Sequence, residues 1–207
     1  MIINKATQDI IRVLLNGNTA IKLRDLAKKA NVSLGMAVKI VNSLASTQFI
    51  NKKNGIKVVQ YERLLKAWAY TVSVNENPKI EFIAAERPQY LIKKISNLLK
   101  NEKYAFTLFS ATEVTFPYVT PNKVHLYILK TKEKEISKIF ISEAVTPAEE
   151  GNVICYLVDE SHLFGSLEIR GIKIISLPQL YVDLISYGGR GQEAAEQILN
   201  LLEKKNV

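Results

Sequence analysis

Apolar residues near the N-terminus recur with helical spacing in two short stretches. Residues 23–30 and residues 37–44 each place apolar side chains three or four positions apart, and residues 31–33 separate the two stretches. Ser33 can cap the second stretch, because its hydroxyl can accept a hydrogen bond from a backbone N–H of the first helical turn. The pattern therefore predicts two short helices joined by a tight turn, which is a helix-turn-helix.

A β-type pattern follows directly after the second predicted helix. The β-prone residues 49–50 and 56–61 flank a polar turn, in which Asn54 and Gly55 are expected to supply the positive φ angles of a hairpin. A basic hairpin placed after such a helix is typical of a winged helix-turn-helix.

Two further amphipathic stretches flank this region. Residues 7–16 predict a first helix, with Thr7 as its cap, and residues 61–71 predict a helix that leads out of the hairpin. Trp68 lies on the apolar side of the second of these helices, and we expect it to pack where two domains meet.

Turn-forming residues 73–78 mark a predicted domain boundary, with one domain over residues 1–72 and a second over residues 78–207. Beyond the boundary, strand-like and helix-like stretches alternate. The predicted strands are residues 80–84, 104–109, 124–129, 153–158 and 172–175, and the predicted helices are residues 88–99, a short helix from 110, 178–186 and 192–204. The expected fold class is α+β, in which a winged helix-turn-helix precedes a mixed α/β domain of about five strands.

Positive charge is concentrated in the first third of the chain. Twelve of the 28 Lys and Arg residues lie within residues 1–66, but only Asp9, Asp25 and Glu62 of the 20 acidic residues do. A basic module joined to a nearly neutral one predicts a polyanion-binding domain with a companion. No apolar run is long enough to span a membrane, and the N-terminus lacks a signal-peptide pattern, so we expect a cytoplasmic protein without a membrane partner.

The exposed face of the second predicted helix carries small, polar and basic side chains, which suit insertion into the major groove of DNA. The residues expected to approach bases are Ser33, Gly35, Met36, Lys39, Asn42 and Ser43. Lys39 and Asn42 are the best candidates for base edges, since each can pair with a purine there. The lysines expected to hold phosphates are Lys28, Lys29, Lys52, Lys53 and Lys57. An alternative is a binding module that recruits a protein, with DNA incidental.

The sequence shows no arrangement of residues that is typical of a catalytic site. The two histidines, His125 and His162, have no cysteine or carboxylate at metal-ligand spacing, and the single cysteine, Cys155, lies in an apolar run typical of a buried strand. We therefore expect no metal, no cofactor and no enzymatic activity. A nucleotidyltransferase-like enzyme stays open as an alternative, but it needs paired acidic residues near a Gly-Ser turn, and Ser110 is followed only by Glu113.

A glycine-rich stretch, residues 188–191, precedes the last predicted helix. Its spacing matches neither a phosphate-binding loop nor a dinucleotide fingerprint, and no strand precedes it. We interpret it as a tight turn between two packed helices. Arg190 within this turn is a candidate contact for a partner protein or for the neighbouring domain.

Residues 176–184 and 187–196 resemble the C-terminal signature of AbiEi-type antitoxins, and residues 104–111, 117–119 and 124–127 resemble the middle of the same domain. The resemblance implies a type IV toxin–antitoxin or abortive-infection system. In that family the N-terminal domain binds inverted repeats and represses its operon, and the toxin resembles nucleotidyltransferases. A stand-alone regulator built from the same parts is equally compatible with the sequence.

These patterns together predict a sequence-specific regulator that binds double-stranded DNA, most simply as a repressor. The expected partners are operator DNA and a cognate toxin. Regulators that read duplex DNA often pair across a two-fold axis, so a homodimer is one expected form, although the sequence does not reveal a pairing surface.

Overall fold

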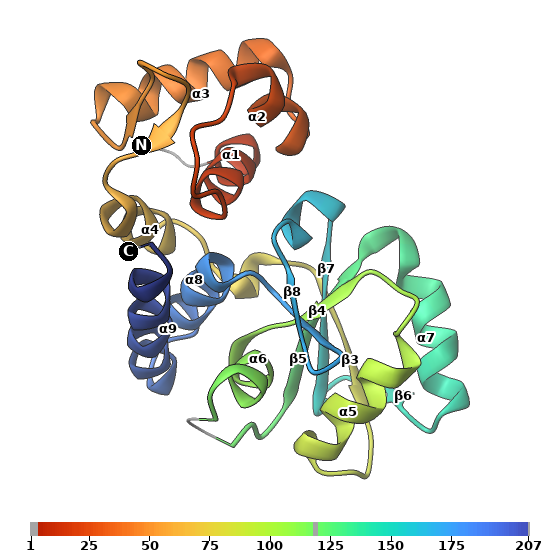
Figure 1. The fold of residues 1–207 in the computed structure, drawn as a ribbon. Coiled ribbons are helices and arrows are strands. Elements are labelled where there is room, and N and C mark those ends of the chain that lie inside the picture. The colour runs from red at the N-terminus through yellow and green to blue at the C-terminus, as the bar shows by residue number, and fades with distance from the viewer. Residues whose placement is uncertain (1–3, 118–119, 207) are drawn as a thin grey trace.

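The computed structural model describes residues 4–117 and 120–206, so residues 118–119 of the resemblance lie outside the described part (Figure 1). The α+β fold class is confirmed. A helical unit, residues 4–72, precedes a sheet unit, residues 78–206; their independence as domains stays a prediction. The elements of the helical unit are α1 (Lys5–Leu15), α2 (Leu23–Lys29), α3 (Leu34–Ser46), β1 (Ile50–Asn51), β2 (Lys57–Val58) and α4 (Tyr61–Ala69).

The first helix begins earlier than predicted. Asn4, not Thr7, is its cap, and the Asn4 side-chain oxygen accepts a hydrogen bond from the Thr7 backbone N–H at 2.9 Å. The Thr7 hydroxyl donates to the same oxygen and is buried in the first turn. The prediction of Thr7 as cap is therefore wrong, because Lys5 and Ala6 already lie in the helix and an asparagine stands one position before them.

Both ends of α3 have defined caps. The Ser33 hydroxyl accepts a hydrogen bond from the Met36 N–H at 3.2 Å, which confirms the predicted cap. At the other end, the Phe49 N–H donates to the Leu44 carbonyl at 3.0 Å, and Gln48 takes a φ of 62°. This geometry is a Schellman-type ending, in which glycine is the usual residue at the left-handed position.

The hairpin forms as predicted, but its turn differs. Strands β1 and β2 pair antiparallel, with Ile50 opposite Val58. Only Gly55 has a positive φ, 94°, and Asn54 does not, so the expected pair of positive φ angles is wrong. The loop between the strands is longer than a two-residue turn and does not need both angles. An antiparallel bridge between Ile21 and Ile56 ties the hairpin to the start of α2.

A seven-stranded mixed sheet forms the centre of the sheet unit, in the order β6-β3-β7-β5-β4-β9-β8. The strands are β3 (Lys79–Ile83), β4 (Tyr104–Phe106), β5 (Val124–Leu129), β6 (Thr146–Pro147), β7 (Val153–Val158), β8 (Leu167–Ile169) and β9 (Ile172–Ile174). Strands β5 and β7 pair in parallel, and nearly all their residues are buried on both faces. The edge strands β6 and β8 are absent from the predicted set, because they are short, exposed or only half-buried, and are not marked by a run of apolar residues.

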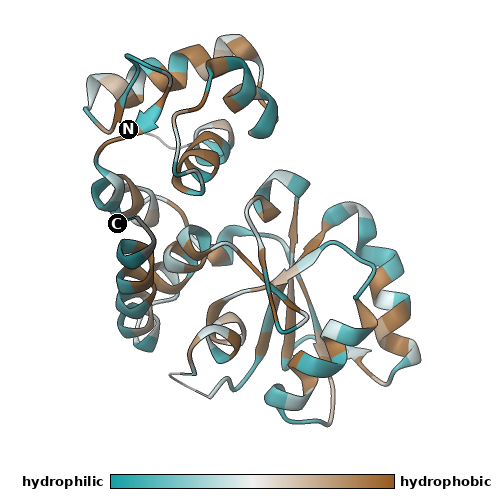
Figure 2. Cartoon of the chain, in the orientation of Figure 1, coloured by the Kyte–Doolittle hydropathy of each residue, from teal (hydrophilic) through white to brown (hydrophobic). Residues whose placement is uncertain are grey.

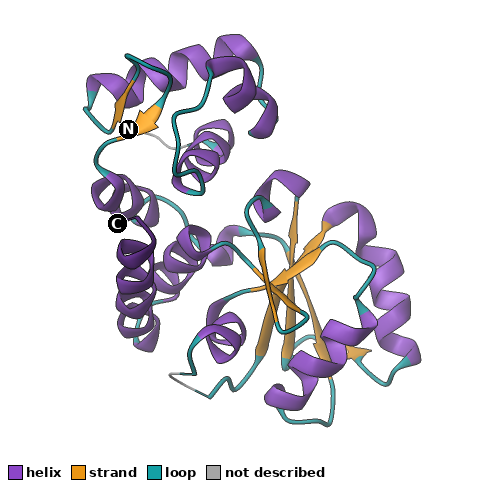
Figure 3. Cartoon of the chain, viewed as in Figure 1, coloured by secondary structure: helices purple, strands orange, loops and turns teal. Residues whose placement is uncertain are grey.

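Helices lie on both sides of this sheet, with α7 on one side and α8 on the other, and α9 packs against α8 (Figure 1). The helices are α5 (Pro88–Leu98), α6 (Leu108–Thr115), α7 (Glu133–Ser142), α8 (Leu177–Tyr187) and α9 (Arg190–Asn206), with short 3-10 turns η1 (Val74–Glu76), η2 (Lys130–Lys132) and η3 (Glu160–Leu163). Helix α7 is absent from the predicted ranges. Apolar stretches of the helices and strands face the interior in both units (Figure 2), and loops connect the elements at the surface (Figure 3).

The two units meet along α1, α4 and α8. Helix α4 packs against α8, and Trp68 of α4 is fully buried, as expected for a residue near this boundary. The Arg12 guanidinium carbon lies 5.4 Å from the Trp68 ring centroid. Within residues 4–117 and 120–206, no helix is long and apolar enough to cross a membrane.

Candidate nucleic-acid interface

Helix α3 presents an open face. Its apolar side chains Ala37, Ile40, Val41 and Leu44 are buried. The residues predicted to approach bases are all exposed: Ser33, Gly35, Met36, Lys39, Asn42 and Ser43. Helix α3 lies on the side of the helical unit away from the sheet, with α1 between them (Figure 1). The sheet unit therefore leaves the exposed face of α3 uncovered.

The hairpin adds a lysine to this face. The Lys52 ammonium donates a hydrogen bond to the Asn42 side-chain oxygen at 2.9 Å. Both residues line a groove between α3, the hairpin and the start of α2, together with Val38 and Lys22. The structure thus joins a residue predicted to read bases with one predicted to hold phosphates.

Lys22 is a member of this groove that sequence reasoning missed. It is exposed and stands at the N-cap position of α2, directly after the bridge between Ile21 and Ile56. That bridge joins residues 35 positions apart, so no local pattern could place Lys22 beside Asn42. The only signal in the sequence was that Lys22 directly precedes the first helix of the predicted helix-turn-helix.

The other predicted phosphate contacts divide between two surfaces. Lys53 and Lys57 are exposed on the hairpin loop and on β2. Lys28 and Lys29 instead line grooves that they share with Phe164 of the sheet unit, and one of these grooves also includes Glu160. The structure therefore does not bring Lys28 and Lys29 into the groove of Asn42 and Lys52.

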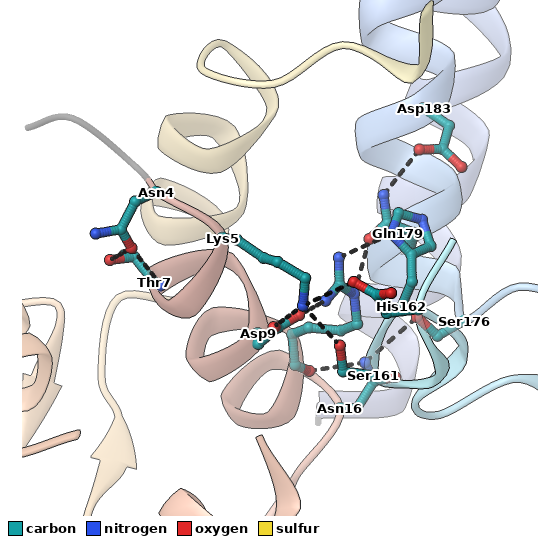
Figure 4. Close-up of polar contacts among 12 residues, drawn as sticks. Asn4, Lys5, Thr7, Asp9, Asn16, Ser161, His162, Ser176, Gln179 and Asp183 are labelled. Atoms are coloured by element: carbon teal, nitrogen blue, oxygen red, sulfur yellow. Dashed lines mark hydrogen bonds and ion pairs between the residues drawn. The ribbon is translucent and has the colours of Figure 1, made fainter. Parts of the chain in front are cut away.

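A buried polar cluster joins the two units and was not predicted (Figure 4). Arg12 of α1 is almost fully buried, and its guanidinium donates to Asp9 at 2.5 Å and to the Gln179 side-chain oxygen at 3.0 Å. Burial lowers the pKa of Arg12, and Asp9 opposes that effect. The third nitrogen of the guanidinium, Nη2, lies 3.4 Å from Nδ1 of His162. The guanidinium thus connects α1 with α8 and with the η3 turn.

The cluster continues into the core through Asp183. Its carboxylate accepts hydrogen bonds from Gln179 at 2.8 Å and from the Thr107 hydroxyl at 2.5 Å. Burial raises the pKa of Asp183 to about 6, and these hydrogen bonds counteract part of the increase. The sequence held one signal for this buried cluster: Arg12 is a charged residue within the apolar stretch of residues 10–15.

Three of the residues considered for chemistry, Ser110, His125 and Cys155, are buried. Ser110 is fully buried, and its hydroxyl accepts a hydrogen bond from the His125 backbone N–H at 2.9 Å. Burial lowers the pKa of His125 to about 4, and it raises the pKa of the Cys155 thiol, which confirms the buried position predicted for that residue. Over the part of the chain that the structure describes, no three His, Cys, Asp or Glu residues cluster as metal ligands.

The glycine-rich stretch is a tight turn between α8 and α9, as predicted. Gly188 and Gly189 have positive φ angles of 77° and 52°. A Cβ atom at Gly191 would lie 2.4 Å from the Leu184 carbonyl oxygen, so the close approach of the two helices requires a glycine there. Arg190 is exposed on this turn.

Residues 57–203 match the sequence model of a family described as a transcriptional regulator, the AbiEi antitoxin of a type IV TA system. The chain belongs to this AbiEi family. No curated protein and no solved structure matched the chain. The match starts at β2, so it includes the sheet unit but not α1, α2 or α3.

Proposed function

We propose that this AbiEi-family protein is a regulator that binds specific sequences of double-stranded DNA, with α3 in the major groove and the hairpin on the flanking backbone. The observation that carries the proposal is the contact between Asn42 on the open face of α3 and Lys52 on the hairpin. The contact supports the proposal because it brings together an amide, which can pair with a base edge, and a cation, and a duplex offers base edges beside phosphates.

Base reading is assigned to the middle of the exposed face. Asn42 and Lys39 can pair with purine edges in the major groove, and the exposed Met36 and Val38 can contact thymine methyl groups. Gly35 has no side chain and nothing near its Cβ position, so the backbone at the leading end of α3 can approach the groove closely.

Phosphate contacts are assigned to Lys53, Lys57 and Lys22. All three are exposed, and none forms an ion pair within residues 4–117 and 120–206. Their charges are therefore available to displace counterions from DNA. Lys28 and Lys29 lie in other grooves, and we leave them out of the proposed interface.

The test is the salt dependence of binding by the whole chain to a duplex recovered by selection from a random library. Lys53→Ala with Lys57→Ala is expected to reduce the slope of log K against log salt by about 2, because each phosphate contact contributes about 0.9. Lys134→Ala with Lys138→Ala, an equal charge change on exposed positions of α7, is the control and is expected to leave the slope unchanged. Equal losses from both pairs, or no duplex recovered by the selection, would refute the proposal.

Base reading has a separate test. Asn42→Ala is expected to cost about 1–3 kcal/mol on the selected duplex and much less on a scrambled duplex of the same length. An equal loss on both duplexes would show that Asn42 does not read bases.

The family description also names an antitoxin of a type IV system. We propose that a cognate toxin is the protein partner and that Arg190, exposed on the turn between α8 and α9, contributes to the contact. In cells whose growth is arrested by the cognate toxin, expression of the wild-type chain should restore growth, and the Arg190→Ala variant should restore it less.

We further propose that the protein binds the duplex as a homodimer. Sedimentation of the complex should then show two chains per duplex, and one chain per duplex would refute the homodimer.

A further inference from the structure

We propose that Lys52, which the sequence predicts as a phosphate contact, is a positioning residue for base recognition and fixes the side chain of Asn42. This inference rests on the proposed function, because it concerns how the same surface reads DNA. The observation is the hydrogen bond from the Lys52 ammonium to the Asn42 side-chain oxygen at 2.9 Å.

A lysine ammonium can only donate hydrogen bonds, so it selects one orientation of the Asn42 carboxamide. The oxygen is turned toward Lys52, and the amide nitrogen is on the other side of the group. A carboxamide without this partner can present either its donor or its acceptor to a base. With Lys52 in place, Asn42 offers N–H donors in a fixed orientation, which suits an acceptor such as purine N7.

The fold holds Lys52 where it can act in this way. The Asn51 side-chain oxygen accepts a hydrogen bond from the Lys53 N–H at 2.8 Å, which shapes the loop around Lys52. The bridge between Ile21 and Ile56 has hydrogen bonds of 2.9 and 2.8 Å and ties the hairpin to α2. Lys52 therefore extends from a loop that is anchored at both ends.

The contact is exposed to solvent in the free protein. When a duplex covers α3, water leaves the surface, and a charge-assisted hydrogen bond gains strength in the lower dielectric. The positioning effect of Lys52 is thus greatest in the bound state, where Asn42 reads its base pair.

The test compares two adjacent lysines that undergo the same change. Each base pair of the selected duplex is substituted in turn, and binding is measured for the wild type and for Asn42→Ala. The base pair at which Asn42→Ala loses discrimination is the one that Asn42 reads. A good contact of this kind discriminates by roughly 5- to 150-fold.

At that base pair, Lys52→Met is expected to lose most of the discrimination, and Lys53→Met to keep it. Methionine removes the charge and the donor but keeps most of the side-chain length. Lys52→Arg, which retains a donor and the charge, is expected to restore discrimination. In the Asn42→Ala background, Lys52→Met should cause no further loss of discrimination.

The outcomes separate this inference from the proposed function. If Lys52→Met and Lys53→Met lower affinity equally and leave discrimination intact, Lys52 is a phosphate contact only and the inference is wrong, while the proposed function stands. If Asn42→Ala loses discrimination at no base pair, base reading by α3 itself fails, and the inference fails with it.

Discussion

Asp183→Asn is expected to change how stability depends on pH. Asp183 is 1% exposed, and burial raises its pKa from 3.8 to about 6. The native state therefore binds the proton more tightly than the unfolded chain does, and the difference corresponds to about 3 kcal/mol. Because the folded pKa is the higher one, this contribution to stability is complete below pH 3.8 and is lost as the pH rises through 6.

His125 has the opposite effect over nearly the same range. Burial lowers its pKa from 6.5 to about 4, so its contribution is complete above pH 6.5 and is lost as the pH falls through 4. In the wild type, the stability that Asp183 loses as the pH rises is offset by the stability that His125 gains over the same range. Asparagine in place of Asp183 can keep both hydrogen bonds, since its oxygen accepts from Gln179 and its amide donates to the Thr107 hydroxyl.

The measurement is urea unfolding of the wild type, Asp183→Asn and Glu149→Gln between pH 4 and pH 7.5. The free energy of unfolding of Asp183→Asn, relative to the wild type, is expected to rise by about 2–3 kcal/mol over this range. Glu149 is exposed in a loop, and its variant should follow the wild-type curve. Parallel curves for Asp183→Asn and the wild type would refute the reasoning.

Other predictions follow from single positions. Gln48→Gly should raise the free energy of unfolding by about 1 kcal/mol in urea titrations, because glycine adopts the φ of 62° without the strain of a Cβ atom in the left-handed region. Gly191→Ala should lower the melting temperature, because its Cβ would lie 2.4 Å from the Leu184 carbonyl oxygen, and Gly35→Ala, with open space at Cβ, should not. Cys155 should react with a thiol reagent only after unfolding, because it is buried and burial raises its thiol pKa.

Short-range patterns were sufficient to predict the helices of the helical unit, but not the cap of its first helix or the turn of its hairpin. The apolar periods of residues 23–30 and 37–44 and the cap at Ser33 depend on neighbours within about one helical turn, and the structure confirms them. The long strands β5 and β7 were predicted for a similar reason, since each is a run of six mostly apolar residues. Elements of two or three residues, such as β6 and β8, owe their existence to pairing partners rather than to their own sequence.

The sites were predicted less completely, because they depend on contacts between distant residues. Arg12 and Gln179 are 167 positions apart, and their local partners, Asp9 and Asp183, do not reveal the contact between them. The distance between Asn42 and Lys52 is only 10 positions, yet their hydrogen bond depends on how the hairpin folds back over α3. The sequence predicted Asn42 and Lys52 as site residues, but it did not predict that their side chains are in contact.

The buried guanidinium of Arg12 has a mechanical consequence. It joins α1, which lies beneath the open helix α3, to Gln179 on the helix that flanks the sheet. Tilting one unit against the other would take Gln179 and His162 away from the Arg12 guanidinium and leave a buried cation with Asp9 as its remaining partner, which is costly in a protein interior. A partner that tilts the sheet unit would therefore have to break this buried contact before α1 and α3 could change their position relative to the sheet.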